Sequence, residues 1–327
     1  MTKHVNNSNM VTEKLSFSQA AEEWLAFLEP QLKESSIVKY RNILNLYLLP
    51  QYGDCPISEI SRTDVAAFSS KLLTCGGMKK EGLAPKTVTG IIAVAKSIFG
   101  YAIQERACPV ADVKGISVKQ SQKTLRVLSR VEQQKLSSYL RKNLSLCNLG
   151  ILTCLYTGLR IGEICALKWE DILFAEQYLY VYKTMQRLQT LSEKGAKTII
   201  SISAPKSECS VRKIPIPDEL FQLFTAYRQP DKAYFLTGEP NQYMEPRTME
   251  NRFKLILKQC GINDAHFHTL RHTFATRCVE LGFDVKSLSE ILGHSTVNIT
   301  MNRYVHPSME LKQKNMNMLS GLFLEKK

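Results

Sequence analysis

The stretch HTLRHTFATRCVELGFDVKSLSEILGHSTVNITMNRY, residues 268–304, holds the most informative pattern in the chain. Five of the six histidines lie inside it or within two residues of its ends, which indicates a functional site. It opens with His268, Arg271 and His272 at the start of an expected helix over residues 270–281. Because positions three and four apart on a helix share a face, these three side chains are expected to point to one side.

Two kinds of site fit this group of side chains. His268 and His272 have the i, i+4 spacing of the histidines in a zinc-binding H-E-x-x-H motif. Here the glutamate is missing, and the fixed charge of Arg271 opposes a divalent cation. The other candidate is an anion site, in which arginine donates two hydrogen bonds to phosphate oxygens and histidine donates a hydrogen bond or transfers a proton. A packing role for the histidine pair is the third interpretation.

The second half of the stretch predicts two helices with a tight turn between them. Gly293 is expected to end a helix over residues 285–292, and Ser295 to cap the next one. His294 would lie in the turn, and Tyr304 would follow after about two and a half turns of helix. Tyr304 is then either a reactive phenol or a half-buried core residue. A helix-turn-helix DNA reader is a further alternative for this segment.

Two features upstream carry charged side chains at suggestive positions. In TGLRIGE, residues 157–163, Gly158 predicts a turn, Arg160 enters a helix, and Glu163 can hold the guanidinium of Arg160. Taken alone, such a pair is a surface ion pair worth a few tenths of a kcal/mol. Lys206 follows Pro205 near the tip of an expected hairpin, which could carry it into a cleft or leave it in a solvated basic turn.

Residues 15–112 are expected to form a small helical domain. Ser16 and Gln19 have the spacing of a capping box. Hydrophobic periodicity and helix-stop residues then predict four helices around one core, over residues 20–28, 35–49 (stopped by Pro50), 62–74 and 86–104 (opened by Pro85).

Residues 113–124 are polar and basic without periodicity, and are expected to be a linker to a second domain, residues 125–312. Ser129 and Glu132 predict a second capping box. The pattern then predicts helices over residues 148–156 and 160–167, three strands of one small antiparallel sheet over residues 178–185, 198–202 and 211–216, and helices from residue 218 onward. The expected fold class is mainly α with a small antiparallel β-sheet.

The composition favours a polyanionic partner. The chain has 327 residues, with 43 Lys+Arg against 30 Asp+Glu, a formal charge of +13. Nucleic acid is the commonest partner of such a protein, although a solvated basic surface is the plainer alternative. The nine cysteines include no C-x-x-C pair, which argues against a disulfide framework and a cysteine metal site. No signal peptide and no apolar run of ~18 residues is evident, so we expect no membrane partner.

Taken together and in this order, the motifs resemble those of the tyrosine recombinase (phage integrase) family. They are TGLRIGE, PKSECSVRKIPI, HTLRH and LGHSTVNITMNRY, preceded by a helical domain that contains the LAPKTV segment. The resemblance covers about residues 15 to 310. It implies a SAM-like core DNA-binding domain over residues 15–112 and an α+β catalytic domain over residues 125–312. The tail, residues 313–327, would dock on a neighbouring subunit or on its own domain.

The resemblance also implies a reaction, a transesterification of DNA through a 3′-phosphotyrosine, with no metal ion and no other cofactor. It implies these roles: Tyr304 as nucleophile, Arg160 and Arg271 as clamps on the scissile phosphate, His294 as hydrogen-bond donor to a non-bridging oxygen, Lys206 as the acid for the leaving 5′ oxygen, His268 as base or orienting group, and Glu163 and His272 as supporting residues.

Elementary electrostatics agrees with these roles. A phosphodiester carries one negative charge and its pentacoordinate transition state about two, so preorganised Arg and His donors favour the transition state. Tyrosine has a reference pKa of ~10, and nearby guanidiniums are expected to favour the phenolate.

The expected partners are double-stranded DNA, further copies of the chain in a tetramer on paired sites, and a directionality factor. Lys86 is a candidate phosphate contact. We expect a cytoplasmic, nucleoid-associated bacterial enzyme that integrates or excises a mobile element, because the hairpin over residues 178–216 is long. The absence of an arm-binding domain before Ser16 counts against that subclass. A Xer-like chromosome-dimer resolvase and a non-catalytic DNA-binding protein of the same fold are the alternatives.

Overall fold

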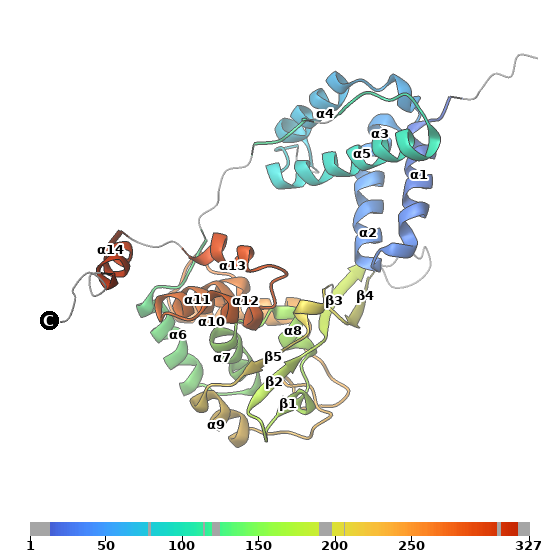
Figure 1. Cartoon of the computed structure of the whole chain (residues 1–327). Coiled ribbons are helices and arrows are strands. Elements are labelled where there is room, and N and C mark those ends of the chain that lie inside the picture. The colour runs from blue at the N-terminus through green and yellow to red at the C-terminus, as the bar shows by residue number, and fades with distance from the viewer. Residues whose placement is uncertain are drawn as a thin grey trace, which may run out of the picture. The chain divides into compact units, whose positions relative to one another are not determined.

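The computed structural model describes residues 14–77, 80–113, 115–119, 125–189, 198–205, 207–305 and 309–319 (Figure 1). The chain divides into two compact units, and their boundary in the sequence falls between Lys123 and Thr124. Each unit has its own hydrophobic core. The described part is mostly helical with small antiparallel sheets, which confirms the predicted fold class.

In its described residues, the first unit consists of helices and connecting segments around one apolar core. The predicted capping box is present, because Ser16 and Gln19 exchange side-chain and backbone hydrogen bonds at the start of the first helix. The core is centred on large side chains such as Phe17, Trp24 and Phe99. The elements are α1 Phe17–Leu28, η1 Glu29–Gln31, α2 Glu34–Ile43, η2 Leu44–Leu48, α3 Leu49–Tyr52, η3 Ile57–Glu59, α4 Arg62–Cys75 and α5 Pro85–Arg106.

The prediction that Pro50 ends the second helix was wrong. The helical path continues from α2 through a π-helical segment, η2, into α3, and Pro50 lies in the first turn of α3. Proline is tolerated in the first turn of a helix because the amide there needs no intrahelical acceptor. The π-helical segment changes the hydrogen-bond register just before Pro50, and the chain passes it without a break.

By length and composition alone, helix α5 could cross a membrane, although its sequence contains no continuous apolar run of ~18 residues. Its apolar side packs in the core of the first unit, where Val88, Ile91, Ile98 and Phe99 are buried. Within the described part of the expected linker, Ile116 and Val118 pack against this core. The carbonyl of Ile116 also accepts a hydrogen bond from Lys96 Nζ at 2.7 Å, so apolar and polar contacts together dock a segment that lacks periodicity.

The second unit surrounds a larger core that includes Trp169, Phe224, Phe235 and Phe253. The predicted capping box of Ser129 and Glu132 opens α6. The elements are α6 Arg130–Lys142, α7 Leu146–Thr157, α8 Ile161–Ala166, η4 Trp169–Asp171, β1 Ile172–Leu173, β2 Tyr178–Val181, β3 Thr184–Gln189, β4 Thr198–Ser203, η5 Glu208–Ser210, β5 Arg212–Pro215, α9 Asp218–Ala226, α10 Pro246–Gln259, α11 Phe267–Glu280, α12 Val285–Leu292, α13 Val297–Tyr304 and α14 Met309–Met318.

The predicted single three-stranded sheet was wrong. The expected strand over residues 178–185 is broken into β2 and β3, which belong to different sheets. One sheet has the order β1-β2-β5 with antiparallel pairing, and Tyr180 lies opposite Lys213. The other contains β3 and β4. Alternation alone cannot reveal the break, because Tyr182, inside the break, continues the aromatic, β-favouring composition of the strand.

Three helices from the stretch of residues 268–304 pack together in the second unit, and α11 joins them to α7. Helix α11 packs on α7, and α12 and α13 pack on each other and on α11 (Figure 1). Gly293 follows α12 in the left-handed conformation, as predicted, but Thr296 rather than Ser295 occupies the N-cap position of α13. This packing brings the ends of α8, α12 and α13 to the same region of the unit.

Candidate active site

The C-terminal end of α12 is held by three arginines from three different segments. The backbone carbonyls of residues 291–293 accept hydrogen bonds from Arg212 Nε, Arg271 Nη2 and Arg160 Nη2, in that order, at 2.6, 2.6 and 3.1 Å. Carbonyls at a helix C-terminus have no intrahelical donors and carry partial negative charge, so guanidinium groups satisfy both needs. One helix end therefore gathers three cations that are far apart in the sequence.

A single buried carboxylate lies between two of these arginines. Glu163 accepts hydrogen bonds from Arg160 Nη1 at 2.7 Å and from both Nη atoms of Arg212 at 3.1 and 2.9 Å. Burial alone would raise the pKa of Glu163, but Arg212 and then Arg160 lower it to about 2. The carboxylate is thus ionised at neutral pH, and the three guanidiniums exceed it by two positive charges.

Arg271 lies deepest in this cluster. Its side chain is 2% exposed, and its Nη1 donates to the carbonyl of Gly158 at 2.8 Å. Burial, followed by the charge of Arg160, lowers the pKa of Arg271 to about 9, which leaves it cationic at neutral pH. Arg160 is more accessible, with 34% of its side chain exposed. A buried cation with too few counterions gains stability from an incoming anion.

Tyr304, the last residue of α13, contacts two histidines. Its Oη lies 2.9 Å from Nδ1 of His272, and its ring is nearly parallel to the ring of His294 at a centroid distance of 6.4 Å. The ring of His268 meets that of His272 edge to face at 4.5 Å. His294 Nδ1 is held in turn by Thr300 Oγ1 at 2.8 Å. The imidazoles therefore line the side of the cluster where the phenol lies.

The three imidazoles are neutral at physiological pH. Burial, followed by neighbouring cationic or imidazole groups, lowers the pKa of His268 to about 4 and the pKa values of His272 and His294 to about 3. As expected, neighbouring guanidiniums act to lower the pKa of Tyr304 and so favour its phenolate. Burial raises its pKa and outweighs the opposing effects of Arg271 and Arg303, because the phenol is only 5% exposed.

Two parts of the sequence match known domain families. Residues 125–310 match the phage integrase family, and residues 16–73 match the N-terminal SAM-like domain of phage integrases. The first match covers more than half of the chain. The chain belongs to the phage integrase family. It is a tyrosine recombinase, an enzyme that breaks and rejoins DNA.

The sequence of this recombinase is similar to those of two known proteins with different names. A XerC-like tyrosine recombinase of Caldanaerobacter subterraneus subsp. tengcongensis is 27% identical, over 98% of this chain and 86% of that protein. The ICEBs1 integrase of Bacillus subtilis is 22% identical, over 90% of this chain and 80% of that protein.

Solved structures share the recombinase fold. The integrase of the Tn1549 transposon in complex with transposon right end DNA matches with a TM-score of 0.76 and 22% identity, over 94% of this chain and 100% of that one. A lambda integrase tetramer bound to a Holliday junction matches with a TM-score of 0.66 and 17% identity, over 94% of this chain and 85% of that one.

The recombinase brings five of the six predicted catalytic residues into one region of the second unit: Arg160, His268, Arg271, His294 and Tyr304. Both supporting residues, Glu163 and His272, touch members of this group. Lys206 lies outside the described residues. Among the described residues, no three His, Cys, Asp or Glu side chains gather to hold a metal ion. Lys86 is exposed at the start of α5 in the first unit.

Arg212, which no sequence motif singled out, lies at the centre of the recombinase's charged cluster. A signal was present in the strand pattern. Arg212 has the same phase as Ile214 and Ile216, and alternation therefore directs it toward the core with them. A charged residue at an inward position of a strand indicates a buried ionic partner.

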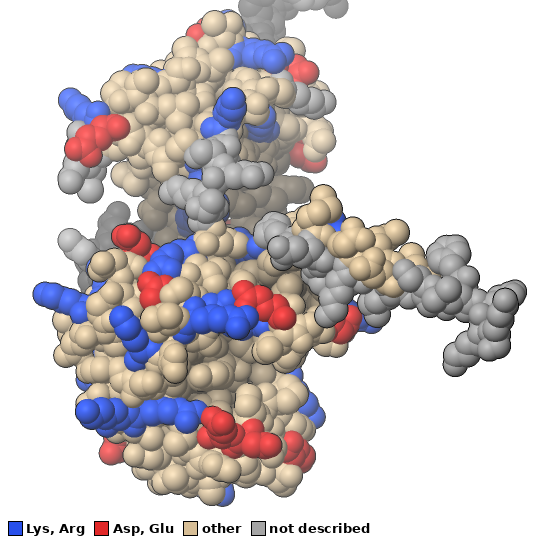
Figure 2. Space-filling model, turned by 90° about the vertical axis from the view of Figure 1, so that its left-hand side faces the viewer, with Lys and Arg blue, Asp and Glu red and all other residues tan. Residues whose placement is uncertain are grey.

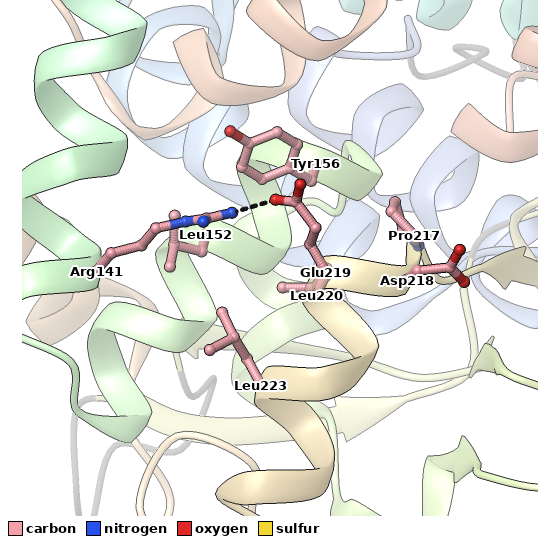
Figure 3. Close-up of a pocket in the computed structure, with 8 residues that line it drawn as sticks. All are labelled: Arg141, Leu152, Tyr156, Pro217, Asp218, Glu219, Leu220 and Leu223. Atoms are coloured by element: carbon pink, nitrogen blue, oxygen red, sulfur yellow. Dashed lines mark hydrogen bonds and ion pairs between the residues drawn. The ribbon is translucent and has the colours of Figure 1, made fainter.

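A separate cavity of about 320 Å³ lies between α6, α7 and the start of α9 (Figure 3). Leu152, Leu220 and Leu223 supply apolar lining, and Arg141 and Glu219 form an ion pair of 2.6 Å across it. None of the predicted site residues lines this cavity. The recombinase's charged cluster therefore lies apart from this cavity.

Proposed function

We propose that Tyr304 attacks a DNA phosphodiester and forms a 3′-phosphotyrosine link. The observation that carries this proposal is the convergence of Arg160 and Arg271 on adjacent carbonyls, Gly293 and Leu292, beside the contact of Tyr304 with His272. An oxygen nucleophile, two guanidiniums and neutral imidazoles are the groups that phosphoryl transfer without a nucleotide cofactor requires.

Charge balance supports a phosphate at this position. The three arginines and Glu163 leave two positive charges in excess, while the pentacoordinate transition state carries about two negative charges. The described hydrogen bonds engage two N–H groups of the guanidinium of Arg160 and two of Arg271, out of five in each. Arg160 meets the phosphate from the exposed side, and Arg271 completes the clamp when the site opens to admit it.

The reaction balances without an external reagent. The bond from phosphorus to the 5′ oxygen breaks as the bond from phosphorus to Tyr304 Oη forms. The phenol loses its proton with the help of His268, Lys206 protonates the leaving oxygen, and His294 donates a hydrogen bond to a non-bridging oxygen. Attack by a 5′-hydroxyl of another strand reverses these events and releases Tyr304.

The DNA substrate is a duplex held by both units. The SAM-like domain over residues 15–112, with Lys86 as a phosphate contact, and the catalytic domain over residues 125–312 flank the linker of residues 113–124. A charge of +13 supplies affinity for phosphates. On the face of the second unit that Figure 2 shows, Lys and Arg lie in separate patches interspersed with acidic groups.

The biological role that we propose is integration or excision of a mobile element in a bacterial cytoplasm, on paired sites, as a tetramer whose tail, residues 313–327, docks on a neighbour. Integrases of Tn1549 and lambda, the latter in a tetramer, share the fold. A directionality factor would decide between the two reactions. A Xer-like resolvase is the second candidate, because a XerC-like relative aligns with 98% of the chain.

The experiment is a trapping assay on DNA that carries the cognate site and a nick near the cleavage position, with a chelator present. The wild-type protein is expected to form a covalent adduct, and Tyr304→Phe to bind the DNA without forming it. Tyr156→Phe removes another partly buried phenol of the same unit and should react normally. An adduct with Tyr304→Phe would show that another residue is the nucleophile, and loss of activity with the chelator would favour a metal mechanism.

A further inference from the structure

Arg212 is a buried cation with contacts on both sides of the candidate active site. It is 8% exposed in β5, and it forms a bidentate ion pair with Glu163 at the start of α8. Its Nε donates to the carbonyl of Ile291 at the end of α12. The side chain of Arg212 therefore joins β5 to the start of α8, which follows Arg160, and to the end of α12, which precedes His294.

The contacts of Arg212 restrict Arg160 through a shared carboxylate. Glu163 accepts from the backbone N–H of Arg160 at 2.9 Å and from its guanidinium at 2.7 Å, so the carboxylate fixes both the backbone and the side chain of Arg160. Arg212 holds the same carboxylate by two parallel hydrogen bonds, the geometry that orients a carboxylate best.

The same side chain restricts the turn that carries His294. Gly293 has φ of +64°, and a Cβ at this position would lie 3.1 Å from Arg212 Cδ and 3.2 Å from Arg212 Nη1. The guanidinium thus fills the space beside the turn, and its bond to Ile291 anchors the preceding carbonyl. Arg212 is therefore packed against the residue that directly precedes His294.

We propose that Arg212 is a positioning residue of the recombinase, which sets Arg160 through Glu163 and His294 through the end of α12. The inference rests on the proposed function, because it assigns Arg160 and His294 to the scissile phosphate. Arg212 reaches neither the phenol nor the phosphate in this role. Lysine cannot replace it, because an ammonium offers no rigid fork that holds both oxygens of Glu163 and the carbonyl of Ile291 at once.

The experiment compares Arg212→Met with a matched control, Arg277→Met. Arg277 is also a partly buried arginine of the second unit that joins a carbonyl, Leu128, to a carboxylate, Glu280, but it lies outside the charged cluster. At saturating nicked DNA, Arg212→Met is expected to form the covalent adduct on the order of 100-fold more slowly with little change in DNA affinity. Arg277→Met should lose stability and keep the wild-type rate.

A double-mutant comparison separates positioning from general stability. If Arg212 acts mainly through Glu163, then Arg212→Met in a Glu163→Gln background adds much less than 100-fold to the loss of rate. Arg212→Lys, which keeps the charge, should recover only part of the rate.

The outcomes distinguish the two proposals. A wild-type protein that forms no adduct overturns the proposed function and this inference with it. A reactive wild type together with an unimpaired Arg212→Met, or with equal effects of Arg212→Met in both backgrounds, overturns this inference alone.

Discussion

The Oη of Tyr304 lies 2.9 Å from Nδ1 of His272, and both side chains are buried. The pKa of His272 is lowered to about 3, so its imidazole is neutral and can accept the phenol proton in a hydrogen bond. In this conformation the candidate nucleophile is held by a supporting residue rather than by His268. Entry of a phosphate must exchange this bond for one with the substrate.

This contact predicts a measurable coupling. His272→Ala removes the imidazole that the buried phenol of Tyr304 contacts, and is expected to lower the free energy of unfolding by about 1–3 kcal/mol. In a Tyr304→Phe background the same change should cost about 1 kcal/mol less. Urea unfolding of the four proteins measures the difference. Strictly additive effects would mean that the hydrogen bond contributes nothing to stability.

Glu163 predicts a stability change in acid. Its pKa is lowered from 4.5 to about 2 in the folded protein, so its contribution is complete above pH 4.5 and is lost as the pH falls toward 2. A shift of this size corresponds to about 3 kcal/mol. Glu163→Gln, which leaves two guanidiniums unpaired, should cost about 3–5 kcal/mol at pH 7. The difference between wild type and variant should shrink between pH 4.5 and 2; a constant difference would show that the carboxylate is not held as described.

His294 predicts an unusual titration. Its pKa is lowered from 6.5 to about 3 by burial and then by Arg271 and Arg160, so protonation is disfavoured in the folded state. Because the unfolded chain binds the proton more readily, this group favours folding most strongly above pH 6.5 and progressively less toward pH 3. NMR of the imidazole should show a neutral ring from pH 8 down to pH 5. A midpoint near 6.5 would mean that the ring is solvated and apart from the arginines.

Local chemistry predicted those features whose causes lie within a few residues. The capping boxes at Ser16 and Ser129 and the left-handed Gly293 each depend on contacts with close neighbours in the sequence. The incorrect predictions concern features that depend on contacts with distant parts of the chain. The register change before Pro50 and the division of the strands between two sheets depend on tertiary packing, which periodicity does not encode.

The candidate active site was likewise predictable only in part from local sequence patterns. The identities of Arg160, Arg271 and Tyr304 came from the order of the motifs, but their convergence on one helix end depends on how α8, α11 and α12 pack. Arg212 was visible only as a charged residue at an inward position of a strand. Its partner Glu163 lies 49 residues away in the sequence, beyond the reach of any local pattern.

The last prediction concerns Gly293, for which the chain offers a close control. Gly293 and Gly261 have nearly equal φ angles of +64° and +65°, so alanine at either position carries the same left-handed strain of about 1–2 kcal/mol. A Cβ at Gly261 meets nothing within 4 Å, whereas one at Gly293 lies 3.1 Å from both Arg212 Cδ and Cys209 O. The backbone oxygen of Cys209 and the doubly anchored side chain of Arg212 cannot both give way without moving the turn.

Gly293→Ala should therefore be less stable than Gly261→Ala. It should also form the covalent adduct on the order of 100-fold more slowly, whereas Gly261→Ala should react at the wild-type rate. Unfolding curves and single-turnover trapping of both variants measure the two effects. Equal rates would show that His294 tolerates a displaced turn, and that the three arginines do not need the end of α12 in this position.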